Sequence, residues 1–452
     1  MKTKIIVMIV CILAIGCSMN RYMVADQYLE RKDFESALQE YIRIAEMGSS
    51  LAMSRNVRAL TGAMMAYYNL GKYKNSFALS KRILSLEKFN STAIFYAGMN
   101  LEMLNKKSLA KKIYAYFKVL SPGDPYYKFI RAKFDQLLQE ELEKRAQLAI
   151  QMENNISEGQ ASDNTTAVLY FLNVLDDTEW NSLSKGLAEM MITDLSQVQK
   201  LKVLERLFIE KLFEEMQLGM SGLADESTAP RVGRLLKARS LVNGAFTIKS
   251  GQNLTITSNL VDIVVSSSQS PMQFSGELKD IFEMEKKIVF GVIEEMGIQL
   301  TAEERKKIGT FATKNFEAFR AYCNGLDKYD FGDYKSASYY FQQAIKLDPS
   351  FMLARDMFNM TDALVSLETG NLPSIKYAYA EANYALTTSR VAEFATQSRL
   401  NQISQNLDLG YLPGAESRNG SSDIISQDWF WDGDWGKLEI LDPPPPPPIP
   451  PN

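Results

Sequence analysis

The sequence predicts a multidomain protein of α and α/β class, in which helical hairpins flank a domain of mixed strands and helices. Two observations carry this prediction. Small and aromatic residues recur at fixed helical intervals near both ends of the chain, whereas the middle contains near-continuous apolar runs typical of buried strands. With 452 residues, of which 46% are hydrophobic, the chain is long enough for roughly two to four domains with buried cores.

The first residues have the pattern of an export signal. Lys2 and Lys4 precede an almost wholly apolar run over residues 5–15. This run is shorter than the ~20 residues that a membrane-spanning helix needs, so it is typical of a signal peptide.

The apolar run ends in the sequence Leu13-Ala14-Ile15-Gly16-Cys17, which resembles a bacterial lipobox. The leucine stands one place earlier than is usual, with Ala14 in its position. The resemblance implies that residues 1–16 are a lipoprotein signal peptide and that the sulfur of Cys17 is lipidated. An ordinary secretory signal, or an anchor helix with an incidental cysteine, is the alternative. Ser18 after the cysteine implies sorting to the outer membrane, as in enterobacterial lipoproteins.

The chain has no histidine and three cysteines, Cys11, Cys17 and Cys323. Without imidazole, the Ser-His-Asp and Cys-His nucleophile systems and His-ligated metal sites are excluded. Because Cys11 leaves with the signal and Cys17 is lipidated, no intramolecular disulfide is expected. We expect Cys323 to be a small buried residue of a helix, with a reactive thiol as the alternative. A net charge of −4 without a basic block argues against a nucleic-acid partner.

Residue spacing predicts helical repeats at both ends of the chain. The same five intervals of 3, 9, 4, 3 and 5 positions occur in two segments, which are Gly98, Leu101, Ala110, Tyr114, Phe117, Pro122 and Gly325, Lys328, Ala337, Phe341, Ala344, Pro349. This pattern resembles tetratricopeptide repeats, which implies antiparallel helical hairpins over residues 17–123 and 313–407. An irregular array of helical hairpins is the alternative.

The resemblance also implies where partners bind. Tetratricopeptide repeats bind peptide segments or neighbouring subunits through a concave face. Tyr67, Asn100 and Tyr322 lie on first helices of hairpins, but we expect them to be structural. Turns are predicted at Lys32-Asp33-Phe34, Gly71-Lys72-Tyr73 and Gly332-Asp333-Tyr334.

A connecting helix and polar linker are predicted over residues 124–160, followed by an α/β domain over residues 161–300. Within this domain, we expect four strands, at residues 167–174, 201–204, 240–248 and 254–265. We expect four helices, at residues 183–198, 208–218, 228–238 and 278–297. A tight turn is predicted at residues 250–253 and a short polar connection at residues 266–274.

Three blocks in this domain resemble the CsgG family of curli production assembly and transport lipoproteins, and the related amino-terminal fold of TolB and of the periplasmic activators of penicillin-binding proteins. The blocks are Val168–Phe171 with Gly186–Ile192 and Leu195, then Val203–Arg206 with Leu212 and Glu215, then Gly233–Ala238 with Leu241–Ile248. An unrelated arrangement of helices on a sheet is the alternative.

One departure from the family affects the expected function. In the curli secretion protein, long membrane-crossing hairpins follow the position equivalent to Gly244. Here the equivalent connection is only residues 250–253, whereas a membrane-crossing strand needs ~9–11 residues. We therefore expect a domain that is tethered by lipid and lacks pore-forming hairpins, with a channel as the alternative.

No segment has a pattern that predicts catalysis. Asp176, Asp177 and Glu179 follow the first strand, where a divalent ion is one option, but we expect a solvated loop that caps the next helix. Ser221 lies between glycines but lacks the strand–turn–helix context of a nucleophile elbow. We therefore predict no catalytic residue, no metal site and no cofactor.

The carboxyl-terminal segment, residues 408–452, has an unusual composition. Three of the four tryptophans lie within seven residues, and a proline run begins eight positions later. The candidate partner-binding residues are Trp429, Phe430, Trp431, Trp435, Pro443 and Pro448. Residues 443–452 as polyproline II would form an arm of roughly 31 Å. The aromatic cluster docks on this protein, docks on a partner or remains disordered, and the three options stay open.

These observations predict a non-catalytic envelope lipoprotein that acts as a scaffold or accessory in assembly or secretion at the outer membrane, facing the periplasm or the cell surface. The expected partners are the membrane through the lipid anchor, other envelope proteins through the repeats and the tail, and a second copy through the CsgG-like domain. The alternative is a periplasmic lipoprotein activator of a penicillin-binding protein.

Overall fold

The computed structural model describes residues 22–46, 53–120, 124, 126–153, 162–204, 206–216, 228–250, 252–263, 267–268 and 271–370. These residues form two compact units whose boundary falls within helix α7 (Tyr127–Gln151). Of the described residues, the first unit comprises those up to Leu137 and those from Ser366 onward, and the second comprises Leu138–Val365. Within the described ranges, no helix combines the length and the apolar character needed to cross a membrane.

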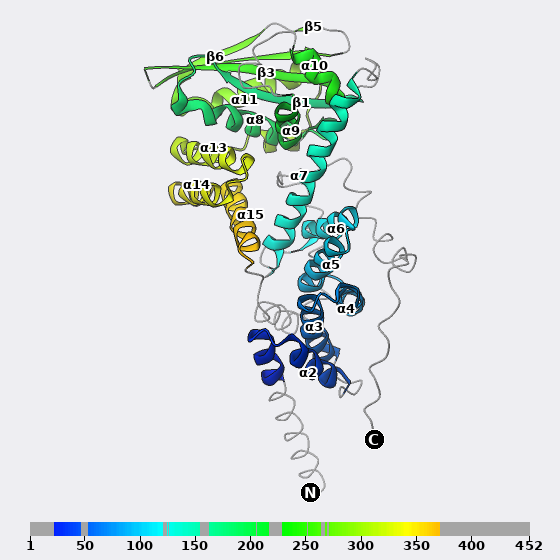
Figure 1. Ribbon diagram of the computed structural model, residues 1–452. Helices are drawn as coiled ribbons and strands as arrows, with labels where there is room; N and C mark the ends of the chain where they lie inside the picture. Colours follow the sequence, from blue (N-terminus) through cyan, green and yellow to red (C-terminus); the bar gives the residue numbers. More distant parts are fainter. Residues whose placement is uncertain are drawn as a thin grey trace, which may run out of the picture. The chain divides into compact units, whose positions relative to one another are not determined.

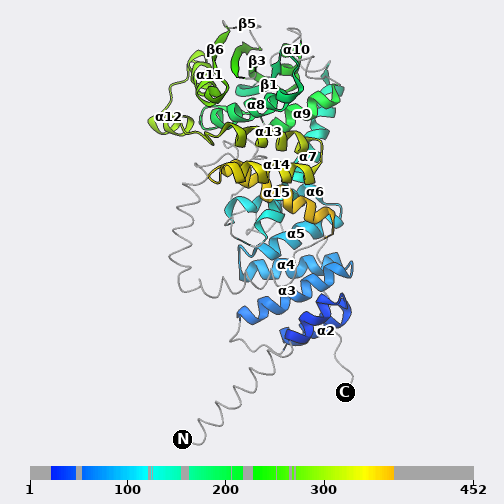
Figure 2. The same cartoon turned by 90° about the vertical axis from the view of Figure 1, so that its left-hand side faces the viewer.

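The first unit is a series of helices in which each packs against the next (Figure 2). α2 buries one stripe of side chains, Ala37, Leu38, Tyr41 and Ile44, whereas α5 is buried on nearly all sides. The helices are residues 22–30, α2 (Phe34–Glu46), α3 (Met53–Asn69), α4 (Tyr73–Leu86), α5 (Ser91–Met103), α6 (Lys107–Tyr114), the 3₁₀ helix η1 (Ala115–Val119) and the first part of α7.

The turns between paired helices share one backbone conformation. Lys32, Gly71 and Gly332 adopt positive φ angles of 62°, 72° and 74°, so all three predicted turns are confirmed. Asn105, between α5 and α6, has a φ of 57° and occupies the same place in its hairpin. A left-handed residue ends the first helix and reverses the chain at each of these positions.

The repeated interval between small and aromatic residues has a packing cause. A Cβ atom on Gly98 would lie 2.2 Å from the ring of Tyr114, and one on Gly325 would lie 2.5 Å from the ring of Phe341. Both pairs are separated by the same number of residues, one pair in each unit. The glycine therefore allows the first helix of a hairpin to approach the aromatic ring of the second.

The second unit contains a mixed six-stranded sheet in the order β2-β1-β3-β4-β5, with β6 also paired to β4. β1 runs parallel to β2 and β3, and the remaining pairs are antiparallel. The strands are β1 (Ser162–Asn173), β2 (Lys202–Val203), β3 (Ala238–Lys249), β4 (Asn253–Asp262), β5 (Ser267–Ser268) and β6 (Met272–Glu277).

Helices α8, α9 and α11 lie on one face of this sheet, and α13 packs on the side of α8 that faces away from it (Figure 1). α8 is therefore enclosed between the sheet and the carboxyl-terminal hairpin. The helices are η4 (Thr178–Trp180), α8 (Asn181–Leu195), α9 (Arg206–Glu215), α10 (Thr228–Leu235), η6 (Leu278–Asp280), α11 (Ile281–Glu295), α12 (Ala302–Ile308), α13 (Phe316–Asp330), α14 (Tyr334–Leu347) and α15 (Met352–Glu368).

Three expectations from the sequence are wrong in detail. β1 begins at Ser162, five residues before the expected start of the first strand. Residues 272–277 form strand β6, whereas a polar connection was expected over residues 266–274. In β6, partly buried and exposed residues alternate, because only Met272, Phe274 and Gly276 face the helical layer. α10 ends at Leu235 rather than at residue 238, because Lys237 adopts a φ of 53° and the chain then enters β3.

Candidate functional site

The carboxyl-terminal hairpin is joined to the sheet domain by a close contact between α8 and α13. A Cβ atom on Gly186 would lie 2.1 Å from the Sγ of Cys323 and 3.0 Å from the ring of Phe319. Phe319, Tyr322 and Cys323 are completely buried. This face of α13 is thus already occupied by α8, and the expectation that Cys323 is a packing residue is confirmed.

Beside this contact lies a buried network of charged side chains, centred on Arg206. Its guanidinium donates two hydrogen bonds to Asp330, at 2.5 and 2.7 Å, and one to Glu189 at 3.0 Å. It also lies 3.3 Å from the hydroxyl of Tyr170 on β1. The network therefore connects the sheet, α8, α9 and the end of α13.

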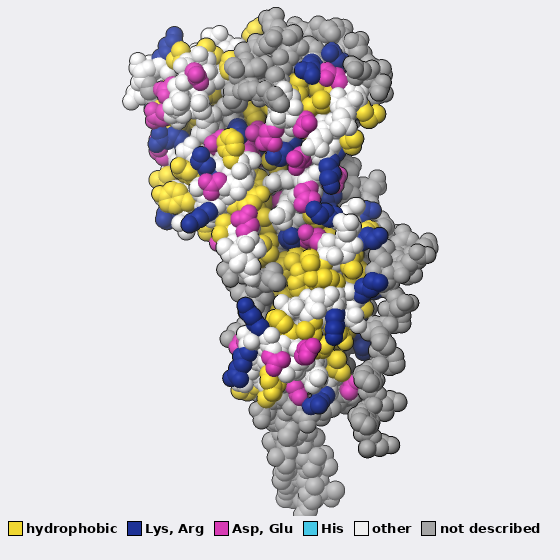
Figure 3. All heavy atoms as spheres, in the orientation of Figure 1, with side chains coloured by type: hydrophobic (Ala, Val, Ile, Leu, Met, Phe, Trp, Pro, Cys, Tyr) yellow, Lys and Arg dark blue, Asp and Glu magenta, His cyan; other side chains and the backbone are white. Residues whose placement is uncertain are grey.

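Lys185 extends the network from α8. Its ammonium lies 3.0 Å from Asp330, 3.1 Å from Glu210 on α9 and 3.5 Å from Asp327 on α13. Its Nζ is also 5.2 Å from the centre of the Phe331 ring, which covers it from the solvent side. Figure 3 shows acidic and basic side chains next to each other over α9 and α13.

The ionisation of this network follows from its pairing. Burial opposes the charge of Asp330, but the Arg206 guanidinium and the Lys185 ammonium together hold the pKa of that carboxyl below its ordinary value. Burial likewise opposes the charge of Lys185, whereas Asp330 and Glu210 raise its pKa. These groups stay ionised across the physiological range. They are suited to fixing the hairpin on the sheet domain and not to transferring protons.

A second buried cluster joins α8 to α11. Glu285 is 1% exposed, and its neighbour Lys286 forms an ion pair with Asp194 and lies 3.5 Å from the Glu285 carboxyl. Burial and the adjacent Asp194 carboxylate raise the pKa of Glu285 well above its ordinary value. Burial therefore favours the protonated form of Glu285 in the folded protein, and burial also raises the pKa of its neighbour Asp194, to about 6.

This protonation predicts a pH-dependent effect of Glu285→Gln. The folded state binds a proton that the unfolded chain releases above pH ~4.3, so the free energy of unfolding declines as pH rises from that value. Glutamine keeps the shape and the neutral charge, and it removes this decline. We expect the stability of the variant relative to the parent to rise with pH from about pH 5, with a slope of at most about 1.4 kcal/mol per pH unit, and to level off above the folded-state pKa of Glu285.

Urea unfolding at several pH values between 5 and 8 measures this difference. Glu283→Gln, at an exposed position of the same helix, is the matched control and should leave the profile unchanged. Parallel pH profiles for Glu285→Gln and the parent would show that Glu285 is ionised in the folded state.

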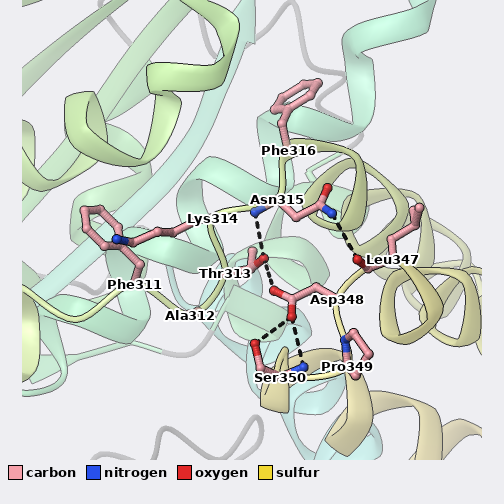
Figure 4. A pocket seen from close by; sticks show the side chains of 10 residues that line it. All are labelled: Phe311, Ala312, Thr313, Lys314, Asn315, Phe316, Leu347, Asp348, Pro349 and Ser350. Atoms are coloured by element: carbon pink, nitrogen blue, oxygen red, sulfur yellow. Dashed lines mark hydrogen bonds between the residues drawn. The ribbon is translucent and has the colours of Figure 1, made fainter.

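An open groove of about 960 Å³ lies at the other end of α13, between the loop of residues 311–316 and the loop of residues 347–350 (Figure 4). Asp348 holds the two loops together. Its carboxylate accepts hydrogen bonds from the Thr313 hydroxyl at 2.5 Å and from the backbone and hydroxyl of Ser350 at 2.9 and 2.6 Å. The Asn315 side chain donates to the carbonyl of Leu347 at 3.0 Å.

Asn100, Tyr322 and Tyr67, which we expected to be structural, differ in burial and in their contacts. Asn100 is buried and donates a hydrogen bond to the Ser76 hydroxyl at 2.8 Å. The ring of Tyr322 packs between Phe341 and Phe351. Tyr67 is half-buried. Asn100 and Tyr322 are therefore structural, as expected.

The acidic loop after β1 is also a capping segment, as expected. Asp177 caps η4 by accepting a hydrogen bond from the backbone N–H of Glu179 at 3.1 Å. Among the residues that the structure describes, no group of three or more Cys, Asp or Glu side chains is arranged to hold a metal ion. The predicted lipidation site Cys17 and the candidate tail residues Trp429, Phe430, Trp431, Trp435, Pro443 and Pro448 lie outside the described ranges.

The first half of the sheet domain, with α8 and α9, lies within a match to a known family. Residues 138–249 match the family model of the Curli production assembly/transport component CsgG. The middle of the chain is a CsgG-like domain. The match begins in α7 and ends with β3, and β4, β6 and α11 of the same sheet and helical layer follow the matched range. No curated protein and no solved structure gives a significant match to the chain.

The charged network was not found by sequence reasoning. Arg206 and Asp330 are separated by 124 positions. Asp330, on α13, also lies outside residues 138–249, the range that matches the CsgG family model. One signal was available, because Arg206 directly precedes the apolar residues Leu207, Phe208 and Ile209. A charged residue beside a buried apolar run requires a partner.

Proposed function

We propose that this chain is a non-catalytic lipoprotein that acts as a scaffold or accessory in assembly or secretion at the outer membrane. The match of residues 138–249 to a family described as an assembly and transport component carries this proposal. Cys17 provides the lipid anchor, and the chain faces the periplasm or the cell surface.

The connection between β3 and β4 supports an accessory role without pore-forming hairpins. Lys249 pairs directly with Asn253, so that only residues 250–252 lie between the two strands. A strand that crosses the membrane needs ~9–11 residues. The chain therefore serves a secretion or assembly machinery through its binding surfaces.

Two surfaces of the described residues suit protein partners. β6 pairs with β4 and with no other strand of the described ranges, so its outer edge can accept a strand from a partner or from a second copy. In the second unit, the face of α13 is filled by α8, and binding of partner segments by repeats therefore falls to the hairpins of the first unit.

In-cell photo-crosslinking of the tagged full chain tests this proposal. A photoreactive residue at Gln273, an exposed position of β6, should crosslink to a second copy or to other envelope proteins in membrane extracts. The matched control is Glu303 on α12, whose side chain is 73% exposed and lies away from the sheet edge.

Two results would contradict the proposal. Recovery of no partner from Gln273 across growth conditions would refute the scaffold role at this edge. Recovery of a penicillin-binding protein as the sole partner would favour an activator of cell-wall synthesis in its place.

A further inference from the structure

The groove at the start of α13 is open to solvent, and apolar and polar side chains contribute about equally to its lining. Phe311, Phe316, Leu347 and Pro349 line it, and Leu347 is 48% exposed. Its volume of about 960 Å³ is at the upper end of the range for sites that enclose an organic ligand. Exposed apolar side chains that lie together in a groove often mark a site where another apolar group binds.

The groove also carries positive charge. The ammonium of Lys314 lies 5.1 Å from the centre of the Phe311 ring, and that of Lys286 lies 5.8 Å from it (Figure 4). Lys286 is already paired with Asp194, whereas Lys314 is exposed and has no ion pair with a described residue. The carboxylate of Asp348 is held by Thr313 and Ser350. The free charge at the groove is therefore that of Lys314.

The walls of the groove are fixed before any ligand binds. The hydrogen bonds of Asp348 and Asn315 hold the two loops together, as Figure 4 shows. A preorganised groove requires little ordering when it is filled, so more of the contact energy is retained as affinity. An aromatic segment with negative charge fits a lining in which apolar side chains alternate with polar ones beside an exposed lysine.

We propose that residues 428–435 of the same chain occupy this groove. Their sequence, Asp-Trp-Phe-Trp-Asp-Gly-Asp-Trp, combines four aromatic rings with three carboxylates. The aromatic rings pack against Phe311, Phe316 and the two apolar residues of the second loop, and a carboxylate pairs with Lys314.

The length of the chain allows this docking. α15 has 17 residues, so its start beside the groove is about 25 Å from its end. The 57 residues of 371–427 connect that region to the aromatic segment. Even as one continuous helix they would extend about 85 Å. Attachment to the same chain gives the segment an effective concentration on the order of 1 mM, which favours it over a separate partner.

Tryptophan fluorescence of the full mature chain tests the proposal. Trp180→Phe removes the one tryptophan outside the tail, so that the emission reports on Trp429, Trp431 and Trp435. We expect acrylamide to quench these indoles several-fold less than the indoles of a free peptide of residues 425–440. Lys314→Glu should raise quenching to the level of the peptide.

The matched control is Lys335→Glu, an exposed lysine at the opposite end of α14, which should leave quenching unchanged. Changing Asp428, Asp432 and Asp434 to lysine in the Lys314→Glu chain should restore protection, since the charges are then exchanged. If protection returns, the Lys314→Glu chain is still folded, and its loss of protection came from the lost charge pair.

Four results would overturn the proposal. Quenching of the parent chain equal to that of the peptide would show an undocked tail. Protection that Lys314→Glu leaves intact would place the tail elsewhere. Protection that is lost on dilution would assign the groove to the tail of a second copy. Protection that appears only with anionic lipid vesicles would assign the tail to the membrane surface.

Discussion

Replacing Arg206 with alanine is expected to lower the free energy of unfolding by about 3–5 kcal/mol, because it removes one of the two cations paired with the buried Asp330 carboxylate and the guanidinium paired with the buried Glu189 carboxylate. Asp330 is 1% exposed, and Arg206 provides two of its hydrogen bonds. Glu189, 3% exposed, loses its ion pair with Arg206 at the same time. Urea unfolding of the chain at neutral pH, followed by circular dichroism, measures the loss.

The control for this variant is Lys211→Ala on the same helix. Lys211 pairs with Glu214 at 2.7 Å near the surface, where an ion pair contributes at most about 1 kcal/mol. A second variant, Arg206→Lys, keeps the charge but loses the paired donors of the guanidinium, and it should fall between the parent and alanine. An effect of Arg206→Ala as small as that of Lys211→Ala would show that the network does not stabilise the hairpin.

The helical hairpins could be predicted from the sequence because their contacts are local. Gly98 contacts Tyr114 across a single turn, and both residues lie within one repeated pattern. The turn positions are also visible, since Gly71 and Gly332 favour the left-handed conformation that the turn requires. Local patterns of this kind depend on few residues and recur along the chain.

The contacts that join elements far apart in the chain could not be predicted in the same way. The partner of Arg206 is set by how α13 packs on α8, and no interval in the sequence encodes it. The groove is formed by two loops, whose shape depends on the hydrogen bonds of Asp348. β6 was missed because its apolar positions, Met272 and Phe274, are too few to mark a strand among polar residues.

The packing of α13 on α8 changes the role expected of the last helical hairpin. A repeat that presents its first helix to a partner needs that face to be accessible. Here Phe319 and Cys323 are buried against α8, and Asp330 is tied to Arg206. The hairpin is therefore a fixed part of the second unit, and the groove beside Lys314 lies at its opposite end.

Gly186→Ala is expected to loosen this attachment and lower the free energy of unfolding by about 1–3 kcal/mol. The added methyl group would meet the Sγ of Cys323 at 2.1 Å, so α13 must move away from α8. Alanine also favours a helix over glycine by about 1 kcal/mol, so the measured loss understates the cost of the clash. Urea unfolding of the single variant gives the net effect.

Cys323→Ala in the Gly186→Ala chain provides the decisive comparison. Cys323→Ala alone leaves a small cavity and should be mildly destabilising, whereas in the double variant it removes the atom that the new methyl group meets. We therefore expect the double variant to be more stable than the sum of the single effects predicts, with a coupling of about 0.5–3 kcal/mol. Additive effects would mean that α13 accommodates the methyl group without using the space at Cys323. The close approach of Gly186 to the thiol would then not be what holds the hairpin on the CsgG-like domain.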